Sequence, residues 1–210
     1  MLGGLAVFWG AMLVAAAANP DYSHRRDYVS TLAAHGAEHS WLGVVAIAAA
    51  AVAMLAGGAL VRSLSRVAAV AVTLAGAGFL VVAFTRLDCP NGAAGCGLGG
   101  RFAVSGSTEI THWTAVTVSS VLFIAGIAAA GVALLRLGHR LPGLATVAAA
   151  AATSAAFLAM GGQKPGGIQR IGILVATGWL AAVAIATLAG YARVAANAPA
   201  PRRRTDRARG

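Results

Sequence analysis

The amino-acid sequence predicts an all-α membrane protein that folds as a bundle of six transmembrane helices. Of its 210 residues, 59% are hydrophobic and 10% are charged, and the mean hydropathy is +0.77. Soluble domains carry about 25% charged residues, so this chain has too few to solvate the surface of a globule of its size. The composition therefore excludes an ordinary soluble enzyme, a disordered chain and a disulfide-rich secreted module.

Six apolar stretches are long enough to cross a bilayer, which takes roughly 17–25 residues of helix. Within them the one charged side chain is Arg193, at the end of the last stretch. Lipid satisfies no backbone hydrogen bonds and strand alternation is absent, so we expect helices, which the many alanines also favour. In chain order the stretches are 2–18, 41–61, 67–84, 112–135, 144–160 and 171–194.

The connections between these stretches differ in length and charge. Residues 62–66 and 136–143 are short and basic, whereas residues 19–40 and 85–111 are long, polar and mixed in charge. With six helices, both basic turns and both termini fall on one side, which collects ten Lys and Arg residues against six on the other. Positive charge marks the cytoplasmic side. We therefore expect a multi-pass cell-membrane protein with both termini in the cytoplasm and extracytoplasmic loops at 19–40 and 85–111.

The two ends of the chain differ in character. Residues 1–195 form the expected transmembrane domain, and residues 196–210 form a basic tail that we expect to be disordered. Such a tail is attracted to anionic lipid headgroups. It has neither aromatic residues nor a fold, so we expect no nucleic-acid binding. The net charge of +10 thus reflects membrane topology and an arginine-rich tail.

The only two cysteines, Cys89 and Cys96, lie in the second long loop. Their spacing predicts a small disulfide-closed loop, which persists only in an oxidising compartment and so agrees with an extracytoplasmic position. Two free thiols are the alternative. A zinc site would need a second pair of ligands that the sequence does not provide nearby.

Small residues recur along the apolar stretches at the spacing that lets membrane helices approach closely. We expect these positions to lie at helix–helix contacts and to have no chemical role. They are Gly57, Gly58, Gly76, Gly78, Gly126, Ala130, Ala148, Ala152, Ala182 and Ala186.

The acidic and histidine residues concentrate on the extracytoplasmic side, which carries five of the six acids and four of the five histidines. Positive charge should be scarce on this side of the membrane, yet two arginines closely follow the first stretch. Such a departure from the general rule is a hint of function. Residues 26–34 also have helical spacing and predict a short helix at the membrane interface. The candidate ligand-binding residues are Arg26, Asp27, Ser30, Asp88 and His112.

Several of these candidates also have a purely structural alternative. Arg26 can pair with Asp21, with Asp27 or with lipid phosphate, and Asp88 can pair with Arg86 or another loop arginine. The hydroxyl residues just before the fourth stretch can serve as helix caps, so the polar segment there is partly a capping signal.

His35 and His39 are the first and last residues of a histidine–x–x–glutamate–histidine pattern, which is typical of inverted zinc peptidases. Two histidines four apart on a helix can share a metal, with Glu38 as general base. A third ligand would have to come from elsewhere, and Asp88 and His112 are the candidates. The sequence requires no cofactor, and zinc at His35 and His39 is a weak hypothesis.

The chain resembles a family of uncharacterised six-helix prokaryotic membrane proteins known as domain of unknown function 998. The matching residues are Tyr22-Ser23 and the segment 28–32 after the first stretch, Asp88 after the third and His112 at the start of the fourth. The Cys89–Cys96 pair and His35/His39 are departures or elaborations. The resemblance implies an architecture and a site, and it implies no particular reaction.

Three functions fit the sequence. The first is binding or transport of a lipid headgroup or small polar ligand at an extracytoplasmic pocket. The second is a membrane-embedded lipid hydrolase or transferase, in which Ser30 or a metal-bound water attacks and His112 acts as base, with Asp88 completing the candidate catalytic set. The third is a structural or assembly partner of another membrane protein. The absence of charged residues in mid-membrane argues against a proton-coupled pump.

Overall fold

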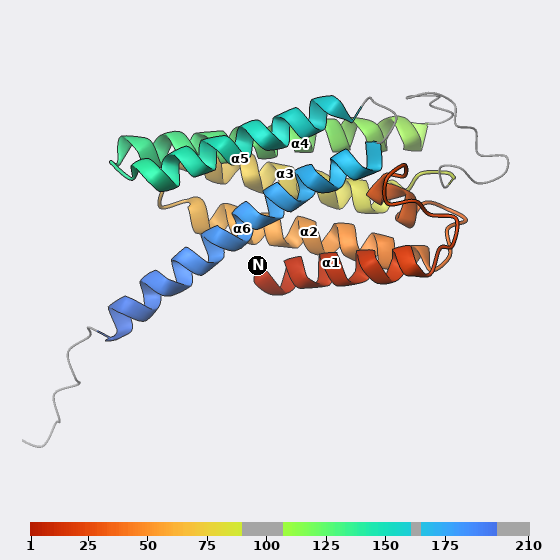
Figure 1. The fold of residues 1–210 in the computed structure, drawn as a ribbon, viewed down its shortest axis with the longest axis horizontal. Coiled ribbons are helices and arrows are strands. Elements are labelled where there is room, and N and C mark those ends of the chain that lie inside the picture. Colours follow the sequence, from red (N-terminus) through yellow and green to blue (C-terminus); the bar gives the residue numbers. More distant parts are fainter. Residues whose placement is uncertain (90–106, 161–164, 197–210) are drawn as a thin grey trace, which may run out of the picture.

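The computed structural model describes residues 1–89, 107–160 and 165–196, with side chains up to residue 190. These residues form six α-helices and one 3₁₀-helix, without any β-strand (Figure 1). The elements are α1 (Leu2–Ala17), η1 (Val29–Ala33), α2 (Ser40–Val61), α3 (Arg66–Phe84), α4 (Ser107–Arg136), α5 (Arg140–Ala159) and α6 (Pro165–Ala196).

The helices match the six predicted stretches and confirm a multi-pass membrane protein. Helices α2 to α6 are long and apolar enough to span a bilayer, and α1 is an apolar helix of 16 residues. Three helices begin four to six residues earlier than predicted, α4 at Ser107, α5 at Arg140 and α6 at Pro165. The 30 residues of α4 extend roughly 45 Å, so its polar first turns continue beyond a hydrocarbon core of about 30 Å.

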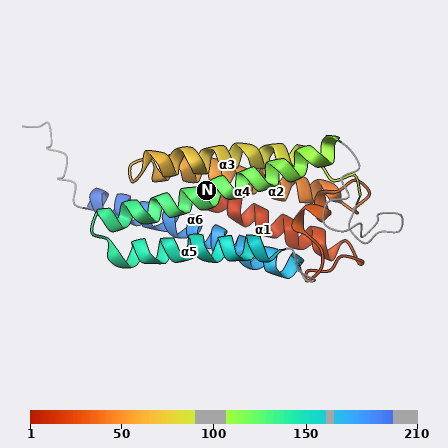
Figure 2. The same cartoon turned by 90° about the horizontal axis from the view of Figure 1, so that it is seen from above.

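Consecutive helices lie side by side along the chain (Figures 1 and 2). Helix α6 crosses the bundle obliquely, contacts α5, α2 and α1, and then continues away from the other helices. We call the end of the bundle that carries residues 19–40 the loop end. The opposite end, which carries the α2–α3 and α4–α5 connections, is the turn end.

Several of the predicted small residues do lie at close helix–helix contacts. A Cβ atom at Gly76 of α3 would lie 2.9 Å from the carbonyl oxygen of Ala51 in α2. A Cβ atom at Gly126 of α4 would lie 2.7 Å from a methyl group of Val72 in α3. No real Cβ approaches so closely, so glycine is what allows α2, α3 and α4 to pack tightly.

The prediction was wrong for α5 and α6. Ala148, Ala152, Ala182 and Ala186 are exposed and face outward. The buried faces instead carry Gly143, Thr146 and Ala150 on α5, and Ala176, Leu180 and Ala184 on α6. These helices are apolar all round, so their sequences contain no polar stripe that would fix which face turns inward.

Part of the short helix predicted at residues 26–34 forms, as a 3₁₀-helix that is buried in the protein and has no face open to lipid. It is η1, all five of its residues are buried, and it packs against α2. A Cβ atom at Gly43 of α2 would lie 2.5 Å from the backbone of Leu32 and Ala33. The first loop is therefore inserted into the loop end of the bundle, because Gly43 leaves room for its backbone.

We expect Gly43→Ala to lower the free energy of unfolding by about 1–3 kcal/mol, the usual cost of forcing extra atoms into a packed site. Gly10→Ala in α1 is the matched control, because a Cβ atom there meets nothing within 4 Å. Replacing this exposed helical glycine should leave stability unchanged or raise it by up to about 1 kcal/mol. Thermal unfolding in detergent measures both variants, and equal stability would contradict the close contact.

Candidate functional site

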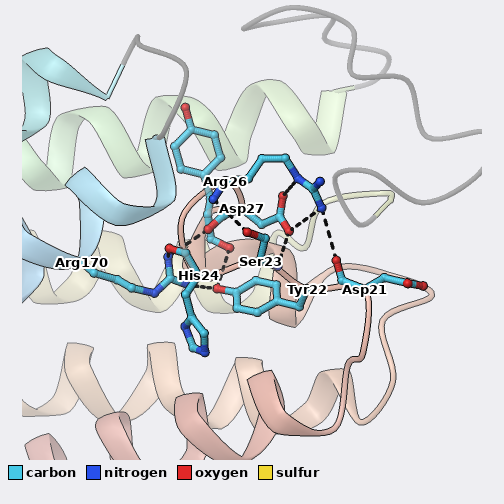
Figure 3. Close-up of polar contacts among 8 residues, drawn as sticks. Asp21, Tyr22, Ser23, His24, Arg26, Asp27 and Arg170 are labelled. Atoms are coloured by element: carbon cyan, nitrogen blue, oxygen red, sulfur yellow. Dashed lines mark hydrogen bonds and ion pairs between the residues drawn. The ribbon is translucent and has the colours of Figure 1, made fainter.

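The first loop turns sharply around the carboxylate of Asp27, whose side chain is 1% exposed. This carboxylate accepts hydrogen bonds from the backbone N–H of Ser23 at 2.7 Å and from Nε of Arg26 at 3.0 Å (Figure 3). The hydrogen bond and charge of Asp27 raise the pKa of Arg26 above its ordinary value. Of the alternatives for Arg26, the structure thus shows the ion pair with Asp27.

Arg170, in the first turns of α6, holds the same loop from the other side. Its NH1 group donates to the carbonyl oxygens of His24 at 2.6 Å, Asp27 at 3.1 Å and Gly166 at 2.8 Å. Its NH2 group donates to the hydroxyl of Tyr22, and its Cζ lies 5.3 Å from the centre of the Tyr22 ring (Figure 3). One guanidinium therefore satisfies three carbonyls at once.

Sequence alone does not distinguish Arg170, because an arginine at the edge of an apolar stretch is typical of any connection between helices. Burial raises the pKa of Tyr22 to about 12, although the nearby positive charge of Arg170 opposes that rise. Tyr22 is therefore a neutral hydroxyl acceptor for Arg170 at all ordinary pH values.

Two further contacts join the loop to the start of α6. The side-chain oxygen of Gln169 accepts from the backbone N–H of Val29 at 2.7 Å, and the N–H of Gly167 donates to the carbonyl of Arg25 at 3.0 Å. A Cβ atom at Gly166 would lie 2.3 Å from the carbonyl oxygen of Asp27. A glycine at this position is therefore needed for the loop and α6 to meet. The adjacent glycines 166 and 167 were the one sequence signal that pointed to this contact.

Arg86 secures the far end of the loop. It donates to the carbonyl oxygens of Ala33 at 2.7 Å and Ala34 at 3.2 Å, and to the hydroxyl of Ser40 at 2.6 Å. Arg86 thus satisfies the carbonyls at the end of η1 and does not pair with Asp88. The carboxylate of Asp88 is exposed and makes no ion pair within the described part of the chain.

His112 is buried near the start of α4, with 1% of its surface exposed. Its Nδ1 donates to the carbonyl oxygen of Thr85, 2.5 Å away, which links α4 to the end of α3. Its Nε2 is buried without a hydrogen-bond partner among the described residues. The ring also makes an edge contact with Trp113.

A cavity of about 140 Å³ lies inside the bundle, lined by residues of η1 and of all six α-helices. Its wall is mostly apolar, with Phe8, Phe79, Phe123 and Phe157 among the lining side chains. The polar side chains of the wall are spread along its length and are Ser30, Trp113, Ser120, Thr153, Gln169 and Thr177. Ser30 and Gln169 belong to the loop end, where η1 meets α6.

The structure separates the residues that the sequence analysis placed in one site. Ser30 lines the cavity, whereas His112 and Asp88 are not part of its wall. Among the described residues the hydroxyl of Ser30 makes no hydrogen bond to a histidine or a carboxylate. A serine nucleophile needs such a base at about 2.6–3.2 Å, so this region contains no assembled serine–histidine pair.

The histidine pattern at 35–39 does not form a helix. These residues are in turns, with Gly36 at φ 85° and His39 at φ 48°. The i, i+4 arrangement that would let His35 and His39 share a metal is therefore absent. Residues 1–89, 107–160 and 165–190 contain no group of three metal-ligating side chains. The predicted Cys89–Cys96 disulfide involves Cys96, which lies outside the described residues, as does the basic tail from 197 onward.

The family model described as "Protein of unknown function (DUF998)" matches residues 2–186. The chain belongs to this family. The match covers the first loop and α1 to α5 completely, and α6 as far as residue 186. No curated protein and no solved structure matches the chain. The family description names no activity.

We expect Arg170→Gln to release the first loop, because one charge-assisted hydrogen bond is worth about 1.5–3 kcal/mol and the guanidinium makes several. Chymotrypsin cleavage after Tyr22 or Tyr28 should then become faster by about ten-fold or more, since cleavage tracks the population of the opened loop. Arg25→Gln is the control, because this nearby arginine is exposed and its side chain makes none of these contacts. Equal cleavage of the two variants would show that Arg170 does not hold the loop.

Proposed function

We propose that this membrane protein binds an amphipathic membrane molecule, with its alkyl chain in the cavity and its polar group at the loop end. The observation that carries the proposal is the cavity itself, which is mostly apolar and is lined by all six helices and, at the loop end, by η1. Pockets of this kind, apolar with a few placed polar groups, are the usual form of small-molecule sites.

The size of the cavity limits what it can hold. Its volume of about 140 Å³ is similar to that of a dry engineered cavity of about 150 Å³ that binds benzene. A segment of a single alkyl chain fits such a space, and a complete two-chain lipid does not. Each buried methylene contributes about 0.8 kcal/mol relative to water, and much less when the chain comes from lipid. Affinity must therefore come mainly from close packing and from the polar end of the ligand.

At the loop end, two side chains of the protein are available to hydrogen-bond the polar end of the ligand. The hydroxyl of Ser30 and the amide NH₂ of Gln169 line the cavity and make no hydrogen bond to other described residues. Both can donate to a carbonyl, carboxylate or phosphate oxygen. The proposed headgroup site therefore includes Ser30, which the sequence predicts, and Gln169, which it does not. Asp88 and His112 do not line the cavity.

The loop end, in this proposal, faces the outside of the cell membrane and both termini face the cytoplasm. The charge distribution supports this orientation. The two short turns at the turn end carry four arginines and no acidic residue, whereas the longer loop end mixes four arginines with all five acidic residues of the described chain. Short loops that are rich in Lys and Arg mark the cytoplasmic side.

A fatty acid with a photoreactive diazirine in its alkyl chain tests the proposal. In nanodiscs it should label cavity residues such as Phe157 and Ile173, which line the interior on α5 and α6. General solvation by lipid would instead label Leu158 and Ile185, which are exposed on the same two helices. Mass spectrometry of the peptides distinguishes the two patterns.

Ala176→Leu should reduce the labelling of the cavity by about ten-fold, because three added carbons occupy much of a space of this size. Ala176 is buried and lines the cavity, whereas Ala182 on the same helix is exposed. Ala182→Leu is therefore the matched control and should leave labelling unchanged. Labelling confined to the exposed residues, or equal in the two variants, would overturn the proposal.

A further inference from the structure

A second hollow lies at the turn end of the bundle, far along the helices from the first loop. Its wall consists of Ala59 and Leu60 at the end of α2, Arg62 and Ser63 in the turn, Arg66 at the start of α3, and Thr187 of α6. Figure 1 shows α6 crossing α2 near this end before it leaves the bundle. The lining thus combines the apolar side chains of Ala59 and Leu60 with two arginines and two hydroxyl residues.

Neither arginine of this hollow has an acidic partner among the described residues. Arg62 follows the last residue of α2, and Arg66 is the first residue of α3. The ion pair found in the described chain joins Arg26 to Asp27 at the opposite end. No acidic residue lies at the turn end within the described ranges. Two uncompensated guanidinium groups beside one turn favour a shared anion, which removes their mutual repulsion.

The start of α3 adds to the attraction for an anion. Ser65 caps this helix, and its hydroxyl accepts from the N–H of Ala68 at 3.2 Å. The remaining first-turn N–H groups carry the partial positive charge of the helix N-terminus. Guanidinium groups supply the stronger, bidentate hydrogen bonds to phosphate oxygens.

The hydroxyl groups of the hollow have different capacities. Thr187 already donates its proton to the carbonyl oxygen of Val183 at 2.8 Å, so its oxygen can only accept. It suits a ligand that carries a hydroxyl or amine donor next to its phosphate. Ser63 can donate to a phosphate oxygen or accept from the same headgroup.

From these observations we infer that the hollow binds the phosphate of an anionic phospholipid, held between Arg62 and Arg66. The glycerol or similar polyol of the headgroup reaches Thr187, and the acyl chains extend along Ala59 and Leu60. This site is independent of the internal cavity, because it shares no lining residue with it.

Native mass spectrometry of the full chain, released from nanodiscs of phosphatidylglycerol and phosphatidylcholine, tests the inference. The wild-type chain should retain phosphatidylglycerol in preference to phosphatidylcholine. The double variant R62Q/R66Q should lose about ten-fold or more of this retention, since two bidentate contacts are removed.

The control variant R136Q/R140Q removes the same charge from the same end of the bundle but leaves the hollow intact. Its retention of phosphatidylglycerol should stay close to that of the wild-type chain. Equal losses in the two double variants would overturn the inference, because they would show general attraction to basic residues. The single variants R62Q and R66Q answer the same question if the double variant does not fold.

Inorganic phosphate distinguishes the two possible sources of the anion. If the site is built for a lipid, millimolar phosphate should leave the phosphatidylglycerol adduct in place, because the acyl chains and the headgroup hydroxyls add to its affinity. Complete displacement by phosphate at that concentration would assign the site to free phosphate and contradict the lipid. Photolabelling of the internal cavity should not change in any of these variants, so the two proposals can fail separately.

Discussion

The middle of the first loop, Asp27 and residues 29–34, is buried inside the end of a membrane helix bundle, and the rest of the structure depends on hydrogen-bonding its backbone. Each backbone polar group left unpaired in hydrocarbon costs several kcal/mol, and a loop cannot pair its groups internally as a helix does. Here the partners come from neighbouring helices. Arg170 and Gln169 of α6 satisfy the first half of the loop, and Arg86 satisfies the end of η1.

This requirement explains the sequence at three otherwise unrelated places. Gly43 and Gly166 leave room for the loop backbone on α2 and α6. Asp27 is buried because it fixes the turn that presents the carbonyls to Arg170. The result is a bundle whose interior is closed at one end by polypeptide held in place by arginine, and the internal cavity is the space that remains below it.

The sequence was sufficient to predict the six helices, because long apolar stretches without charges have few other structures available to them. It did not predict which faces of α5 and α6 turn inward. Both helices are rich in alanine on every side, so Ala150 and Ala152 are indistinguishable in sequence although one is buried and the other is exposed. In membranes the usual polar stripe is missing, and the buried face depends on shape alone.

The charge pattern of the first loop draws attention to it in the sequence, and it allows Arg26 to pair with Asp27, as the structure shows. Arg170 was missed because its partners are carbonyl groups more than 140 residues away, which leave no trace in local spacing. Asp88 and His112 were placed with Ser30 because all three lie at the same end of the bundle. Position along the membrane normal, however, does not say which side chains share a cavity.

The most direct measurement is hydrogen exchange of the wild-type chain in nanodiscs, followed at the backbone amides of residues 27–33. If the loop is held inside the bundle end, the amide of Val29, bonded to Gln169, should exchange about as slowly as those of the adjacent helix α2. Exchange of residues 27–33 at the rate of an exposed loop, with α2 still protected, would contradict the account, because the loop would then not close the bundle.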